Sequence, residues 1–240
     1  MLSVSPAEKR RMKVLRADSA LQVNPDSPDY LSSYTALILK VPLVNNRGQY
    51  RLNIFPDASS LQPNEIRLNR NDVFAVTDIG LFISQYNPTS GNHGNYPLIS
   101  FPDPGVFLGV PASGLKEFEC LEALYNGQLF LKQQSVDRST TIPTNFMRHV
   151  PERAFTTSGS TPGQGDVETS LFELERMVVL SGQDDNTVEF SAANNADLGA
   201  LQGGLTAAGA AAATRNMLTI FLGGVLYRNM AAAALRNREY

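Results

Sequence analysis

The sequence predicts a mainly β protein: a jelly-roll-type antiparallel β-sandwich with one short helix and an extended N-terminal arm. Short apolar or alternating runs recur along the 240 residues, separated by Pro, Gly and Asn, which is the pattern of strands and turns. The hydrophobic fraction of 42% is enough to bury a core. About eight candidate strands match a jelly roll better than a smaller immunoglobulin-like sandwich.

The first strand candidates lie in the N-terminal third of the chain. Tyr34–Val41 is apolar and β-branched, and Gln49–Phe55 alternates polar and apolar residues. The intervening Asn45–Gly48 has turn chemistry, so these two runs are expected to form a hairpin. Val73–Ser84 is the strongest strand signal, and Gly80 inside it suggests a bulge or bend.

One helix is predicted in the middle of the chain, with Ser113 as its cap and Asn126-Gly127 at its end. Its apolar residues recur at helical spacing: Leu115, Phe118, Leu121, Leu124 and Tyr125. A strand over Phe118–Leu124 is the alternative. Gln128–Gln133 follows as a strand, and the more polar Val136–Ile142 is expected to pair with it.

The C-terminal third repeats this pattern. Phe172–Leu180 and Thr187–Ser191 flank a polar turn and predict a second hairpin. Met217–Tyr227 is the last strong strand. Two long segments are expected to be loops, namely the Ser/Thr/Gly-rich residues 156–170 and the region 192–214, which is rich in Ala and Gly.

The N-terminal segment differs from the rest, so the chain divides into a basic arm, residues 1–30, and a single β-sandwich domain, residues 31–240. The arm carries five basic residues near its start: Lys9, Arg10, Arg11, Lys13 and Arg16. Pro6–Glu8 can open a short helix, whereas Asn24–Asp29 is typical of an extended connection. The arm is either a frayed, solvated tail or a segment that orders on a partner subunit, nucleic acid or an anionic membrane surface.

Composition and charge exclude several classes of protein. A single cysteine allows no intrachain disulfide and no Cys-rich metal module. A net charge of -3 argues against nucleic-acid binding by the whole chain. We expect no signal peptide, because no apolar segment follows the basic cluster, and no transmembrane segment, because no apolar run is long enough.

The residues of catalytic or metal-binding type have sequence surroundings that favour structural roles. His93 and His149 have no metal-ligand partners at suitable spacing, and Cys120, in an apolar stretch, is expected to be a buried, inert thiol. Asp184–Asn186 offers oxygen ligands for a cation, but hairpin turns use the same residues. The sequence therefore predicts no catalytic residue, no cofactor and no metal, and a protein that is not an enzyme.

Two further pairs of residues leave a binding or catalytic role open. Glu173 and Glu175 would share one side of a strand, as paired catalytic carboxylates do, although a solvated face is the default expectation. Tyr86 and Tyr96 flank a polar loop and can serve either as a sugar-binding platform or as packing residues.

The chain resembles the jelly-roll coat proteins of small icosahedral viruses and bacteriophages. The resemblance lies in the basic arm Lys9-Arg10-Arg11-x-Lys13, the connector Asn24–Asp29, the strand-rich body and the closing strand Met217–Tyr227. It implies a structural virion protein, assembled in the host cytoplasm, whose partners are copies of itself and other virion proteins. It also implies that the arm contacts genome, an internal membrane or a neighbouring subunit.

Assembly is also favoured on physical grounds. Charged residues make up only 18% of the chain, which reduces repulsion between copies packed side by side. The Ala/Gly tract 199–213 permits close backbone approach at an interface. The alternative hypothesis is a soluble β-sandwich binding module for a carbohydrate or protein ligand.

Overall fold

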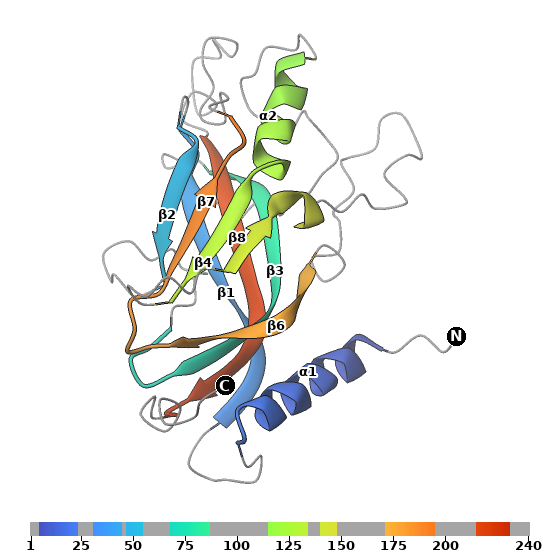
Figure 1. The fold of residues 1–240 in the computed structure, drawn as a ribbon, viewed down its shortest axis with the longest axis vertical. Coiled ribbons are helices and arrows are strands. Elements are labelled where there is room, and N and C mark those ends of the chain that lie inside the picture. Colours follow the sequence, from blue (N-terminus) through green and yellow to red (C-terminus); the bar gives the residue numbers. More distant parts are fainter. Residues whose placement is uncertain are drawn as a thin grey trace.

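The structure of the protein, a computed structural model, describes residues 5–23, 31–44, 47–54, 68–86, 115–133, 140–147, 171–194 and 215–230. Within these ranges it is mainly β: two antiparallel sheets of four strands each and two α-helices (Figure 1). The predicted antiparallel β-sandwich is therefore confirmed. Figure 1 shows α1 and α2 at opposite ends of the sandwich.

The first sheet contains the long strands of the chain. Its order is β1 (Leu31–Pro42), β8 (Arg215–Arg228), β3 (Val73–Tyr86) and β6 (Phe172–Ser181). All three neighbouring pairs are antiparallel. The predicted closing strand is β8, which occupies the centre of this sheet between β1 and β3.

The second sheet is built from short strands. Its order is β2 (Gln49–Asn53), β7 (Thr187–Ser191), β4 (Gln128–Lys132) and β5 (Thr140–Pro143). In β2, residues alternate strictly between exposed and buried positions, as the alternating sequence predicts for a strand with one face on the core.

The pairing of the strands follows a simple rule. β1 pairs with β8, β2 with β7, β3 with β6, and β4 with β5. The eight strands thus form one long antiparallel ribbon with its tip at β4–β5. The ribbon is rolled so that its successive strand pairs lie alternately in the first and the second sheet.

This arrangement confirms one predicted strand pair and contradicts two. β4 and β5 pair as expected. The hairpins predicted for β1–β2 and for β6–β7 are wrong, because the members of each pair lie in different sheets. Turn residues between two strands show that the chain reverses, but they do not show that the strands pair. The twelve residues of β1 find twelve partners on β8, which the five-residue β2 cannot provide.

The main core fills the space between the two sheets. Tyr50 and Phe190, on paired strands of the second sheet, stack with ring centroids 6.2 Å apart. From the first sheet come buried side chains such as Leu37, Phe74 and Ile220. The helix α2 (Leu115–Tyr125), confirmed where the sequence predicted it, adds Ala123, Leu124 and Tyr125 to this core.

A short 3₁₀ helix follows β5 and closes the core beside α2. It spans Thr144–Met147, and Met147 is buried in the main core. Thr144 is also buried, and its Oγ1 donates a hydrogen bond to the carbonyl oxygen of Leu124 at 2.8 Å. This bond ties the end of α2 to the second sheet. Cys120 of α2 is buried, as predicted.

β3 contains a bulge, but not at Gly80. The register shifts between Val76 and Asp78, so Thr77 is the extra residue. Gly80 is required for packing instead, because a Cβ there would lie 2.6 Å from the ring of Phe82. Glycine at this position makes room for packing, whereas the bulge changes which side chains face the core.

The remaining sequence predictions fall largely outside the described residues. The loop 156–170 lies wholly outside them, and of the region 192–214 the structure describes residues 192–194. Neither described helix is long and apolar enough to cross a membrane.

Candidate functional site: the N-terminal helix on the first sheet

The basic N-terminal segment forms the helix α1, Pro6–Ala20, where the sequence analysis expected an extended arm with at most a short helix. Ser5 caps the helix: its side chain accepts a hydrogen bond from the backbone of Glu8, and Glu8 bonds back to the Ser5 backbone. Pro6 occupies the first turn, where its missing N–H costs nothing. The hydrogen bonds from Ser5 lower the pKa of Glu8.

α1 lies against the outer face of the first sheet, across β1, β8 and β3 (Figure 1). Ala17 and Leu21 are fully buried there, together with four residues of the sheet: Val73, Ala75, Val225 and Tyr227. Burial of apolar surface contributes about 25 cal/mol per Å². This small second core explains why the segment does not project as an extended arm.

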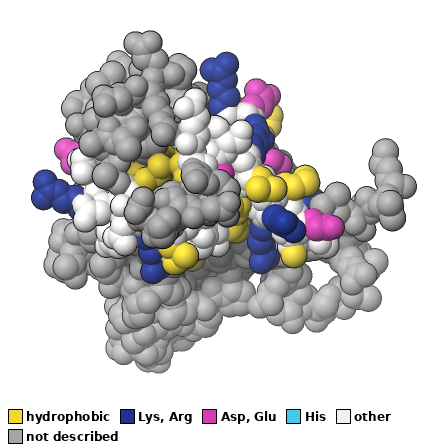
Figure 2. All heavy atoms as spheres, turned by 90° about the horizontal axis from the view of Figure 1, so that it is seen from below, with side chains coloured by type: hydrophobic (Ala, Val, Ile, Leu, Met, Phe, Trp, Pro, Cys, Tyr) yellow, Lys and Arg dark blue, Asp and Glu magenta, His cyan; other side chains and the backbone are white. Residues whose placement is uncertain are grey.

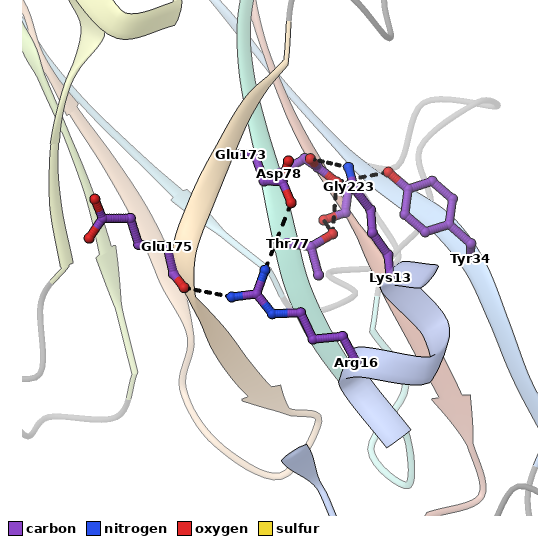
Figure 3. A network of polar contacts seen from close by, with 8 residues as sticks. All are labelled: Lys13, Arg16, Tyr34, Thr77, Asp78, Glu173, Glu175 and Gly223. Atoms are coloured by element: carbon purple, nitrogen blue, oxygen red, sulfur yellow. Dashed lines mark hydrogen bonds and ion pairs between the residues drawn. The ribbon is translucent and has the colours of Figure 1, made fainter. Parts of the chain in front are cut away.

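A buried ion pair reinforces the contact. Lys13 Nζ lies 2.5 Å from Asp78 Oδ1, and the two side chains are 21% and 2% exposed, respectively. The other carboxylate oxygen, Oδ2, accepts hydrogen bonds from the hydroxyl of Tyr34 at 2.9 Å and that of Thr77 at 2.7 Å (Figure 3). A buried carboxylate requires such partners, since an unpaired one is costly.

The bulge in β3 puts Asp78 on the side of the sheet that faces α1. Val76 before it and Ile79 after it both point into the main core. Strict alternation would direct Asp78 into that core; the extra residue Thr77 turns it outward instead. On the adjacent strand a Cβ on Gly223 would lie 3.1 Å from the Tyr34 hydroxyl, so glycine leaves room for the cluster.

The surroundings of Tyr34 keep its hydroxyl protonated. Burial, followed by the negative charge of Asp78, raises the pKa of its hydroxyl well above its ordinary value. The hydroxyl therefore remains a donor toward Asp78. The Lys13 ammonium lies 5.9 Å from the Tyr34 ring centroid, within the range of a cation–π contact.

Two further residues of α1, Arg16 and Asp18, contact the sheet. Arg16 donates a hydrogen bond to the carbonyl oxygen of Glu175 at 2.8 Å and lies 3.8 Å from the carboxylate of Glu173 (Figure 3). This ion pair is exposed and contributes little. Asp18 is buried and accepts a hydrogen bond from the Tyr227 hydroxyl at 2.7 Å.

The outward side of α1 presents basic and apolar residues together. Lys9, Arg10 and Arg11 are exposed, and so are Met12 and Leu15, at 56% and 54%. Figure 2, which views this end of the molecule, shows hydrophobic side chains beside Lys and Arg side chains. Of the five predicted arm cations, Lys13 and Arg16 contact the sheet, and Lys9 and Arg11 are exposed. Arg10 is also exposed, but its charge acts on Tyr34 of β1 and lowers the pKa of that hydroxyl, against the larger effect of burial.

The polar groups around Asp78 are engaged with one another. Both oxygens of Asp78 are occupied by protein groups, and Lys13 is directed at that carboxylate. The cluster therefore anchors α1. The outward side of the helix is thereby held in a fixed position on the sheet.

Sequence reasoning found the basic residues of this site but missed their partners. The available signal was Asp78 itself, a single carboxylate within the most apolar strand of the chain. Such a residue needs a cation or several donors when buried. Tyr34 and Thr77 carry no comparable signal, because both residue types are common in strands.

The other candidate residues have ordinary surroundings or lie outside the described ranges. Glu173 and Glu175 are both exposed, as the default interpretation predicted. The Asp184–Asn186 segment forms the turn between β6 and β7. Among the described residues there is no group of three or more His, Cys, Asp or Glu that could hold a metal. His93 and His149 are outside those residues, as are the side chain of Tyr86 and the whole of Tyr96.

Comparisons of the chain with protein-family models, with curated proteins and with solved structures find no match.

Proposed function

We propose that this protein is a structural virion protein, a subunit of an icosahedral capsid shell that assembles through its loops and N-terminal segment, and that its fold is a jelly roll. The observation that carries the proposal is the pairing of β1 with β8, β2 with β7, β3 with β6 and β4 with β5. A two-sheet sandwich of eight strands rolled in this way matches the jelly rolls of capsid proteins, lectin domains and cupins. The choice among these classes depends on surfaces rather than on the fold.

The composition supports assembly among these classes. Only 18% of the residues are charged, and the net charge is -3. Copies of such a subunit can pack closely without strong electrostatic repulsion.

The anchored helix supports a neighbouring subunit as the partner of the N-terminal segment. Lys13 and Arg16 are already engaged by the sheet, so fewer cations remain to neutralise nucleic-acid phosphates. Met12 and Leu15, exposed on the same helix as Lys9 and Arg11, suit a protein surface better than a phosphate backbone. We infer that this face of α1 packs against another subunit in the shell.

Assembly of the purified chain tests the proposal. Light scattering after size exclusion, with negative-stain microscopy across salt and pH, should reveal closed shells or regular multimers. The double substitution Met12→Ser/Leu15→Ser should shift the protein toward smaller species without changing its thermal unfolding. Val44→Ser, at another exposed apolar residue, is the matched control. A monomer under all conditions would contradict the proposal and favour the binding-module alternative.

A further inference from the structure

The second sheet carries a hollow on its outer face, away from α1. The hollow has a volume of about 640 Å³ and is lined by residues on or next to β2, β7 and β4. Its lining includes Arg47, Gln49, Arg51, Phe130, Lys132 and Glu189. This volume falls within the range of small-ligand sites, which is about 300–1,000 Å³.

The strand register explains why these side chains converge. Arg51, Glu189 and Phe130 are opposite one another on three adjacent strands. Their neighbours along the strands, such as Leu52 and Leu131, point into the core, so all three point outward. The result is a row across the sheet that runs from a cation through a carboxylate to a partly exposed aromatic ring.

The charges in the hollow favour an anion. Glu189 is paired with Lys132 at 2.5 Å and with Arg51 at 3.8 Å. Arg47 lies 5.1 Å from the centroid of the Tyr50 ring, and its Nε donates to the carbonyl oxygen of Gln49. Three cations and one carboxylate thus line the hollow, and two of the cations, Lys132 and Arg51, are paired with that carboxylate. Arg51 is 68% exposed, so its guanidinium can reach a ligand.

We propose that this hollow binds a carboxylated sugar residue, such as a hexuronate. The ligand's carboxylate would meet Arg51 and Lys132, for which charge-assisted hydrogen bonds are strong. Its hydroxyls would donate to Glu189, which retains acceptor capacity at the oxygen facing Arg51. The apolar C–H face of its ring would pack on Phe130.

A sugar fits this surface better than an acidic peptide does. The hollow lies on the face of the sheet over β2, β7 and β4. Although β2 is an edge strand, Arg51, Glu189 and Phe130 point out from that face rather than toward the edge, where an added strand would pair. Its recognition groups are side chains on one face of a sheet, and a rigid ring with donors, an anion and an apolar face matches all of them.

Saturation-transfer NMR on the full chain tests this assignment, and it applies equally to a monomer and to a large assembly. A failure here is therefore distinct from a failure of the capsid proposal. The probes are methyl glucuronide, methyl glucoside, which lacks the charge, and acetate, which lacks the ring. The glucuronide should bind with a Kd of about 1 mM, and the other two at least about tenfold more weakly.

Variants locate the site. Arg51→Ala and Phe130→Leu should each weaken glucuronide binding about tenfold or more, whereas Arg176→Ala, an exposed arginine on β6 of the other sheet, should have no effect. Circular dichroism verifies that each variant folds. Equal binding by Arg51→Ala and the unmodified chain, competition by acetate as strong as that by the glucuronide, or no saturation transfer at about 10 mM would each overturn the proposal.

Discussion

Replacing Lys13 with Met tests whether the buried ion pair holds α1 to the sheet. The substitution removes the cation but leaves the Asp78 carboxylate, which is 2% exposed. Breaking a buried pair in this way costs about 3–5 kcal/mol. The hydroxyls of Tyr34 and Thr77 still donate to the carboxylate, so we expect about 3 kcal/mol, the lower end of that range.

Substituting the other partner of the ion pair, Asp78, should reduce the free energy of unfolding by less. Asp78→Asn leaves the lysine without its partner, but Lys13 is 21% exposed and its ammonium can turn toward water. The new amide oxygen can still accept from Tyr34 and Thr77. We therefore expect a cost of about 1–2 kcal/mol, in the range of an impaired buried hydrogen-bond set. The double variant should resemble Asp78→Asn, because no buried charge remains unpaired.

Hydrogen exchange measured by mass spectrometry on the peptide covering α1, together with urea unfolding followed by circular dichroism, gives the two readouts. The chain has no tryptophan, so fluorescence is the weaker probe. A loss of about 3 kcal/mol corresponds to roughly 100-fold faster exchange in α1 where the helix opens locally. Lys9→Met, on the same helix but exposed, is the control and should change neither readout. Unchanged exchange in Lys13→Met, or a larger cost for Asp78→Asn, would refute this reasoning.

Three other outcomes follow from the structure. Gly224→Ala would put a Cβ 2.1 Å from the carbonyl oxygen of Ala75, so we expect a loss of about 3 kcal/mol or more in urea unfolding; a normal urea midpoint would contradict the packing. The raised pKa of Tyr34 means that the folded state retains this proton more tightly than the unfolded state. Its contribution is therefore complete below about pH 10 and lost as the pH rises further, and Tyr34→Phe should flatten that alkaline fall in urea titrations. Arg16→Ala removes an exposed ion pair and should cost less than about 1 kcal/mol, and a cost equal to that of Lys13→Met would show that burial is not the deciding factor.

The local elements of this fold were predictable from local patterns. The alternation in Gln49–Asn53, the helical spacing in Leu115–Tyr125 and the long apolar run of β8 each depend on residues close in the sequence. Hydrophobic periodicity reports which face a segment buries, and it does so without knowledge of the partner. The mainly β class followed from these patterns.

The candidate site was predictable only in part. The cluster of basic residues is visible in the sequence, but Lys13 bonds to a carboxylate 65 positions away. That contact depends on the bulge at Thr77, which turns Asp78 out of the core. The sequence predicted the bulge at Gly80 instead, three residues later. Bulge position depends on how two strands align, and no single strand contains that information.

The amino-acid sequence by itself determined the strands, the central helix, the low content of charged residues and the basic character of the N-terminal segment. The tertiary structure decided which strands pair and where that segment rests. Turn chemistry near Asn46 and Asp184 indicated chain reversals, but the sandwich sends the strands on either side into different sheets. The choice of partner for each strand depends on burial and hydrogen bonding across both sheets. It is therefore settled only when all eight strands come together.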